Sequence, residues 1–309
     1  MNYDIKIKGE LEKDGLIEFD RFNQITQNTK DIATKSLMLR LGGFSELTPS
    51  KIIKQALEIR LSNFTTPSRS ESLITIDCDT FEKSLKDIQY NLFKPTEELL
   101  KLTPMALVIQ SFSAALKEDG DKDNLDKPLL KSLLKFKKNF VTNKEVFSLS
   151  NRSSIPEIEI KKEDFKKIES LEDSIPAPSK VIINGKLDEM KYSKGKLVLI
   201  TSDGNVNSFI KDNSIIDQIV NFMGKEITIN GIGHFKPSGH LSFVEILEFF
   251  EPGKSDKIFS RRPIAMTTEQ QILFHLKEGK NKNSLSKIIG KWPGDESDEE
   301  FEQLLKELD

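Results

Sequence analysis

The chain of 309 residues is poor in cysteine, and Cys78 is its single thiol. One cysteine excludes a disulfide within the chain and any metal cluster built from several thiolates of one chain. Cys78 lies between Asp77 and Asp79, and neighbouring carboxylates disfavour the thiolate that a nucleophile requires. The sequence therefore predicts a buried, unreactive thiol.

Long apolar runs are also lacking, as is the basic and then apolar start of a signal peptide. We therefore expect a cytoplasmic protein without a membrane partner. The nucleophile-elbow, metalloprotease and dinucleotide-binding motifs are missing as well. We expect a protein that acts by binding, with no cofactor and no metal ion, although carboxylates assembled only by the fold leave a hydrolase or nuclease as an alternative.

Charge is unevenly distributed along the chain. The formal net charge is −3, yet residues 292–309 hold eight acidic residues and one lysine. Residues 1–291 then keep 45 basic and 41 acidic residues and are weakly basic. An acidic end on a weakly basic body is typical of an interaction segment.

Residues 1–150 show the patterns of an α+β domain, with strands first and helices later. Apolar and polar residues alternate over residues 3–9, which predicts a half-buried strand. A helix is expected next, from an N-cap at Asp20 to the break at Gly42 and Gly43.

Two further strands are expected at residues 57–61 and 73–76, joined as a hairpin by a polar loop that contains Pro67. Helical spacing of apolar residues then returns in three stretches, at residues 81–92, at residues 99–116 and, with Asp126 as N-cap, at residues 129–134.

The composition of residues 151–178 predicts a connector, with a short helix at residues 163–171. It ends in Pro176, Ala177 and Pro178, a stiff and extended combination. We therefore expect the following residues to form a separate domain.

Residues 179–262 predict a small β-barrel. Strand-like runs bounded by glycine-rich turns occur three times, a helical period follows, and two more strand-like runs close the region. In order, the elements are strands at 181–190, 197–200 and 206–210, a helix at 215–223, and strands at 227–231 and 241–250.

This order of elements, with its Asn184-Gly185-Lys186 segment and its pattern from Lys225 to Gly231, resembles the OB-fold superfamily. The resemblance implies binding of single-stranded nucleic acid by aromatic and basic residues on the second and third strands and nearby loops. The residues at matching places are Lys186, Lys191, Tyr192, Lys194, Lys196, Phe209, Lys211 and Lys236. Because residues 180–262 hold twelve basic and ten acidic residues, a structural or protein-binding barrel is an open alternative.

Residues 263–309 predict a helical, acidic C-terminal tail. One apolar stripe should bind a partner, and its residues are Trp292, Phe301, Leu304, Leu305 and Leu308. Because an isolated helix of this length is marginal in water, the stripe should pack on the body of the chain, on a second copy or on another protein. The tail is similar to endings of some bacterial antitoxin-type and defence-linked proteins, a resemblance that implies partner binding.

These patterns together predict a non-enzymatic, nucleic-acid-associated accessory subunit of a bacterial complex, in anti-phage defence or toxin neutralisation. Its barrel would bind single strands and its tail a protein partner. The alternative is a protein–protein adaptor without a nucleic-acid role. Frequent lysine, asparagine and isoleucine are typical of a bacterium with an AT-rich genome.

Overall fold

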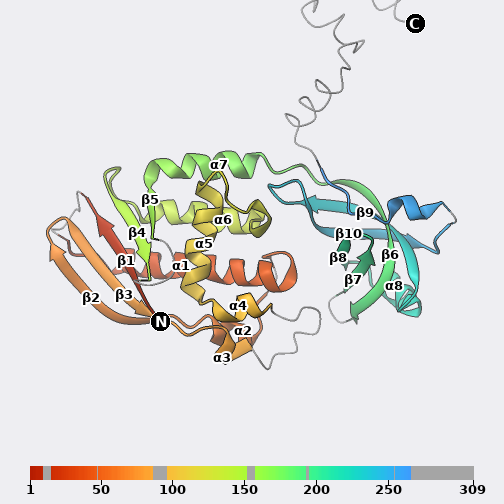
Figure 1. Ribbon diagram of the computed structural model, residues 1–309, viewed down its shortest axis with the longest axis horizontal. Coiled ribbons are helices and arrows are strands. Elements are labelled where there is room, and N and C mark those ends of the chain that lie inside the picture. The colour runs from red at the N-terminus through yellow and green to blue at the C-terminus, as the bar shows by residue number, and fades with distance from the viewer. Residues whose placement is uncertain are drawn as a thin grey trace, which may run out of the picture. The chain divides into compact units, whose positions relative to one another are not determined.

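The computed structural model describes residues 1–9, 15–46, 48–85, 96–151, 157–192, 195–253 and 255–265. Residues Met1–Ala265 form one compact unit of mixed α+β class (Figure 1). The expected tail helix lies outside the described residues, as do the candidate partner-binding residues Trp292, Phe301, Leu304, Leu305 and Leu308.

The first part of the unit is an antiparallel sheet with strand order β2-β3-β1-β4-β5. Its strands are β1 (Asn2–Lys8), β2 (Arg60–Ser68), β3 (Glu71–Asp77), β4 (Val146–Ser150) and β5 (Ile158–Lys161). The alternation that predicted β1 has the expected consequence, because Tyr3, Ile5 and Ile7 are buried in the core. The same core contains Cys78, which is fully buried as predicted.

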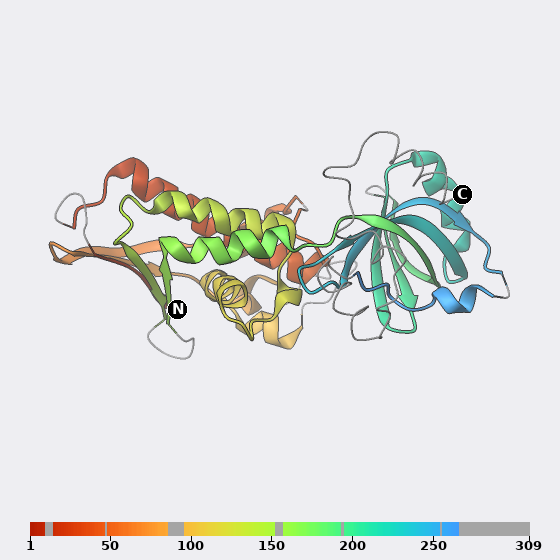
Figure 2. The same ribbon diagram turned by 90° about the horizontal axis from the view of Figure 1, so that it is seen from above.

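Helices pack beside this sheet and bury their apolar faces in the same core (Figure 2). They are α1 (Phe19–Gly42), α2 (Lys51–Ala56), α3 (Glu82–Leu85), α4 (Glu97–Lys101), α5 (Pro104–Leu116), α6 (Lys127–Phe136) and α7 (Phe165–Asp173). In the described part of the chain, no helix has both the length and the apolar character needed to cross a membrane.

The predicted hairpin exists, but its loop is shorter than expected. Strand β2 continues through Pro67 to Ser68, and the turn is made at Arg69 and Ser70. Proline is tolerated there because β2 is the edge strand of the sheet, where a missing N–H removes no hydrogen bond on the open side.

Two helix predictions require correction, one at its N-terminal cap and one because the expected helix is interrupted. The carboxylate of Glu18, rather than Asp20, caps α1, because it accepts hydrogen bonds from the backbone N–H groups of Asp20 and Arg21 at 2.7 and 3.1 Å. The helix expected over 99–116 is two helices, α4 and α5. Thr103 is extended before Pro104 and its hydroxyl caps α5, so that the chain breaks between them.

Strands β4 and β5 were not predicted from the sequence, whereas α7 corresponds to the short helix expected in the connector. Ile158, Ile160, Phe165 and Ile168 all contribute to the first hydrophobic core. A strand of four residues carries too little alternation to be distinguished from a loop by its sequence.

The second part of the unit is a closed five-stranded barrel, as predicted, with the circular order β10-β8-β7-β6-β9. Its elements are β6 (Ser179–Lys191), β7 (Lys196–Thr201), β8 (Gly204–Ile210), α8 (Asn213–Ile219), β9 (Glu226–Phe235) and β10 (Leu241–Phe250). Strands β8 and β10 pair in parallel and the other neighbours are antiparallel. This arrangement is consistent with an OB-like fold.

The barrel has a hydrophobic core of its own. Leu187, Leu197, Leu199 and Ile229 are fully buried in it, and Ile219 of α8 packs against them. Alternate residues of each strand therefore face outward, and they form the surface described next.

Candidate nucleic-acid interface

Strand pairing places a lysine beside an aromatic ring on the outer face of the barrel. Lys196 of β7 and Phe209 of β8 are directly opposite each other in the antiparallel register. Lys196 Nζ lies 5.8 Å from the centre of the Phe209 ring, within the range of a cation–π contact. The register of β7 and β8 thus places two of the predicted site residues, Lys196 and Phe209, side by side.

A second cross-strand pair extends this surface. His234 of β9 and Phe243 of β10 are opposite each other, and their rings are stacked 4.3 Å apart at 11°. The Phe243 ring also meets Phe209 edge to face, with 5.6 Å between ring centres. The three rings, all half-buried, form a continuous aromatic surface, which we call the platform (Phe209, His234 and Phe243).

The segment that follows α1 covers part of this platform. The Phe44 ring lies 4.6 Å from Phe209 and 4.8 Å from Phe243, and Lys196 Nζ is 6.0 Å from its centre. Phe44 is 8% exposed. An aromatic side chain of the first part therefore occupies a position where a stacked base could lie.

Gly43 makes this close approach feasible. It caps α1 in the left-handed conformation, with φ of 78°, and its N–H donates to the Leu39 carbonyl at 2.8 Å. A Cβ at this position would be 2.0 Å from the side-chain nitrogen of Asn207 on β8. Glycine is therefore required both by the backbone conformation and by the packing against the barrel.

Asp126 holds the segment that follows α1 in place through hydrogen bonds to Ser45. Its carboxylate accepts hydrogen bonds from the Ser45 N–H and hydroxyl, both at 2.6 Å, and from the Leu129 N–H at 3.0 Å. The predicted N-cap of α6 is thus confirmed and has a second role. Burial raises the pKa of Asp126, and the hydrogen bonds to Ser45 and Leu129 only partly offset that rise.

A hollow of about 470 Å³ adjoins the platform. Lys127 and Lys131 supply exposed ammonium groups at its edge. His234 Nε2 is buried and has no hydrogen-bond partner among the described residues. Burial lowers the pKa of His234, which favours the neutral imidazole. The hollow therefore offers a ring face and two cations, beside the carboxyl groups of Glu46 and Asp126 in its lining.

Of the remaining predicted residues of the barrel, Lys211 is close enough to His234 to influence its charge, and the others lie on β6 or after it. Lys211 is exposed after β8 and pairs with Glu245 at 2.7 Å. The hydroxyl of Tyr192 donates to Asp217, and the side chain is 58% exposed. Lys186 and Lys191 lie on β6, the first exposed and the second half-buried. Lys194 is outside the described residues.

Lys236 belongs to the β9–β10 turn and is half-buried. Its Nζ donates to the backbone carbonyl of Asp123 at 2.8 Å. Ser238 and His240 of the same turn bind the Asp123 carboxylate, His240 Nδ1 at 2.8 Å. This turn is therefore attached to the loop before α6.

Sequence reasoning missed Phe44, His234 and Phe243 as members of the surface. His234 and Phe243 occupy outward positions of strands that were predicted, so alternation could have placed them there. Phe44 carried no comparable signal, because it follows a helix at a glycine break. In the described part of the chain, no three His, Cys, Asp or Glu side chains are grouped as a metal site.

Comparison with known proteins adds no family to these observations. No protein-family model matches the chain, and neither the curated proteins nor the solved structures contain a match. The functional argument therefore depends on the geometry of the chain itself.

Proposed function

We propose that the protein belongs to the OB-fold superfamily and binds single-stranded nucleic acid through the outer face of its barrel, as a non-enzymatic accessory subunit of a bacterial complex. The observation that carries the proposal is the platform, where Phe209, His234 and Phe243 present ring faces beside Lys196. Aromatic faces stack with any base. Lys196 is only 5% exposed and contacts the rings, whereas the exposed Lys127 and Lys131 can pair with phosphates, so the combination suits binding with little sequence preference.

The hollow beside the platform supports the same proposal. A base inserted there would stack on the ring pair of His234 and Phe243, while its phosphates would meet Lys127 and Lys131. Those lysines come from α6, outside the barrel. The binding surface would then include the segment Phe44–Glu46 and the start of α6 as well as the barrel. Both parts of the chain would contribute residues to it.

Phe44 gives the proposed site an internal competitor. Its ring covers Phe209 and Phe243 at stacking distance. An incoming base must displace this ring or stack beyond it, and so the segment would limit affinity in the absence of a partner.

The first test is a fluorescence-anisotropy titration of the full chain with labelled single-stranded and duplex DNA and RNA, at low and moderate salt. We expect single strands to bind more tightly than duplexes, and we expect the affinity for single strands to fall as the salt concentration rises. Replacement of exposed Tyr192 by alanine should weaken binding less than replacement of Phe243. Absence of binding to every probe at low salt would refute the proposal.

A second candidate function, a protein–protein adaptor, is favoured by the acidic and apolar stripe in residues 292–309. In that role the chain should lose a co-purifying partner when these residues are deleted. A partner retained by the truncated chain would place the protein interface elsewhere.

A further inference from the structure

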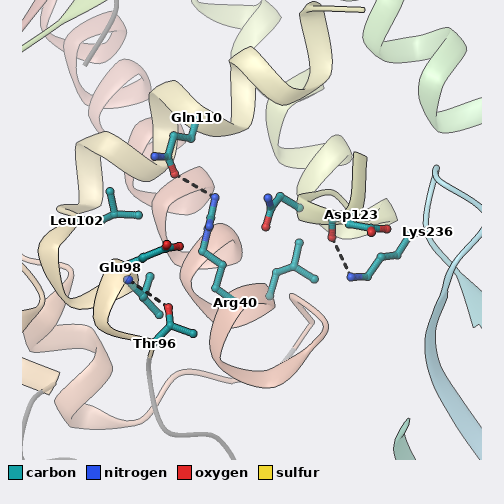
Figure 3. Close-up of a pocket in the computed structure, with 10 residues that line it drawn as sticks. Arg40, Thr96, Glu98, Leu102, Gln110, Asp123 and Lys236 are labelled. Carbon is teal, nitrogen blue, oxygen red and sulfur yellow. Dashed lines mark hydrogen bonds between the residues drawn. The ribbon is translucent and has the colours of Figure 1, made fainter. Parts of the chain in front are cut away.

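A second hollow, of about 460 Å³, lies beside the last turn of α1 (Figure 3). Its lining comes from α1, α4, α5, the loop before α6 and the β9–β10 turn. Figure 3 shows Arg40 between Gln110 and the pair of Asp123 and Lys236. None of its lining residues belongs to the platform.

Arg40 is incompletely satisfied in this hollow. Its Nη2 donates to the side-chain oxygen of Gln110 at 3.0 Å, whereas its Nε is buried without a hydrogen-bond partner. Within the described ranges, no carboxylate lies at ion-pair distance from Arg40. Burial lowers the pKa of Arg40, and the charge of Asp121 only partly compensates. A partly buried guanidinium without a carboxylate at ion-pair distance is costly unless another anion compensates its charge.

Lys236 supplies the second cation. One of its three donors is used by the Asp123 carbonyl at 2.8 Å, which leaves two for a ligand. Burial lowers the pKa of Lys236 as well, and Asp123 opposes that effect.

Two carboxylates also line or adjoin the hollow. The Asp123 carboxylate is occupied by Ser238 and His240. Glu98 is exposed on α4, and Figure 3 shows its carboxylate on the side of Arg40. Neither one neutralises Arg40 directly.

We infer that this hollow binds a phosphate group through Arg40, with Lys236 of the same lining as a second source of positive charge. A guanidinium presents paired N–H groups to phosphate oxygens.

The inference goes beyond the proposed function, because it does not require the barrel to bind a strand. The phosphate can belong to a free mononucleotide or to the 5′ end of a nucleic acid. Both ligands present the same phosphate group to Arg40, and the experiment below distinguishes them.

The test is isothermal titration calorimetry of the full chain with adenosine 5′-monophosphate and with adenosine, followed by titration with 5′-phosphorylated and 5′-hydroxyl forms of one short single strand. The variants are Arg40→Gln, Arg40→Lys and Lys236→Gln. The control is Lys101→Gln, which removes one positive charge from an exposed position of α4 that does not line the hollow.

We expect a preference for the phosphorylated member of at least one pair. That preference should fall roughly tenfold or more in Arg40→Gln, since charge-assisted hydrogen bonds are lost. Arg40→Lys should recover part of it, and Lys101→Gln should behave as the wild type. A preference limited to the mononucleotide identifies a free ligand, and one limited to the strand identifies a strand end.

Equal binding of both members in each pair would overturn the inference, as would a phosphate preference that survives in the Arg40 and Lys236 variants. If Arg40→Gln fails to fold, Arg40→Lys and Lys236→Gln decide the matter. Strand binding without any phosphate preference would refute this site while leaving the proposed function intact.

Discussion

At the scale of single residues, aromatic side chains on the barrel differ in what they contact. Phe243 of β10 stacks with His234 and meets Phe209. Phe250 lies on the same strand, is 50% exposed and has no ring partner among the described residues. Alanine variants of Phe243 and Phe250 therefore distinguish a role in binding from the general effect of removing a phenyl ring.

Replacement of Phe243 by alanine should weaken single-strand binding by about 1–3 kcal/mol, because one stacking surface is lost. Fluorescence anisotropy measures the change. Phe250→Ala should leave the dissociation constant unchanged. Equal losses in the two variants would show that the platform has no special part in binding.

Another residue-scale prediction concerns a buried ion pair that supports the first part. Glu145 is fully buried and accepts from Arg21 Nη2 at 2.7 Å and from the Val141 N–H at 2.9 Å. Glu145→Gln should lower the free energy of unfolding by about 3 kcal/mol, because it leaves the Arg21 charge uncompensated. Urea denaturation measures this difference.

The matched control is the surface pair of Lys137 and Glu169, also 2.7 Å apart but with side chains 39% and 46% exposed. Glu169→Gln should cost about 0–1 kcal/mol, since solvent screens the pair. Similar costs in the two variants would contradict the argument from burial.

At the scale of elements, the segment after α1 acts as a cover for the barrel. Gly43 ends the helix, Phe44 lies on the platform, and Ser45 is held by Asp126. The cover is thus positioned by two separate elements, α1 and α6.

Phe44→Ala should increase the affinity for single strands about tenfold, because a base no longer competes with the ring for a stacking contact worth about 1–3 kcal/mol. The control is Phe64→Ala, which removes an exposed phenyl ring from edge strand β2. Anisotropy titrations compare the two variants. A loss of affinity in Phe44→Ala would mean that the ring itself stacks with the bound base.

The attachment of the β9–β10 turn to Asp123 is a second element-scale contact, and it should depend on pH. Burial alone would raise the pKa of Asp123, but hydrogen bonds from Ser238 and His240 outweigh it, so the pKa lies below its ordinary 3.8. Stability from this carboxylate is therefore fully present above the ordinary value and is lost as the pH falls through the lower pKa of the folded state.

Asp123→Asn should cost about 0.5–1 kcal/mol in the free energy of unfolding at pH 6, a modest value because the side chain is 44% exposed. The difference from wild type should shrink at pH 3. Urea denaturation at both pH values measures it. A difference of the same size at both values would contradict a role for the ionised carboxylate.

At the scale of the whole molecule, charge limits how strongly the protein can hold a strand. The net charge is −3, and the exposed lysines that line the hollow beside the platform are Lys127 and Lys131, since Lys196 is only 5% exposed. Two phosphate contacts predict a slope of about −1.4 for log affinity against log salt with single strands. Anisotropy titrations over a salt series measure that slope, and a slope near zero would exclude phosphate pairing.

The sequence by itself determined the elements with a clear period: the strand at the N-terminus, helix α1, the cap at Asp126 and the five barrel strands in their order. Local periodicity and capping are properties of neighbouring residues, so they can be recognised before the chain folds. It also placed Lys196 and Phe209 among the candidate site residues.

Only the tertiary structure decided what those elements form together. The pairing of His234 with Phe243, the position of Phe44 on the platform and the unsatisfied Nε of Arg40 all depend on residues distant in sequence. Periodicity distinguishes buried from exposed faces, but it does not say which strand pairs with which, in what register, or which side chain covers the result. Closure of the barrel and its contacts with α1 and α6 supply that information, because they fix distances that no local pattern encodes.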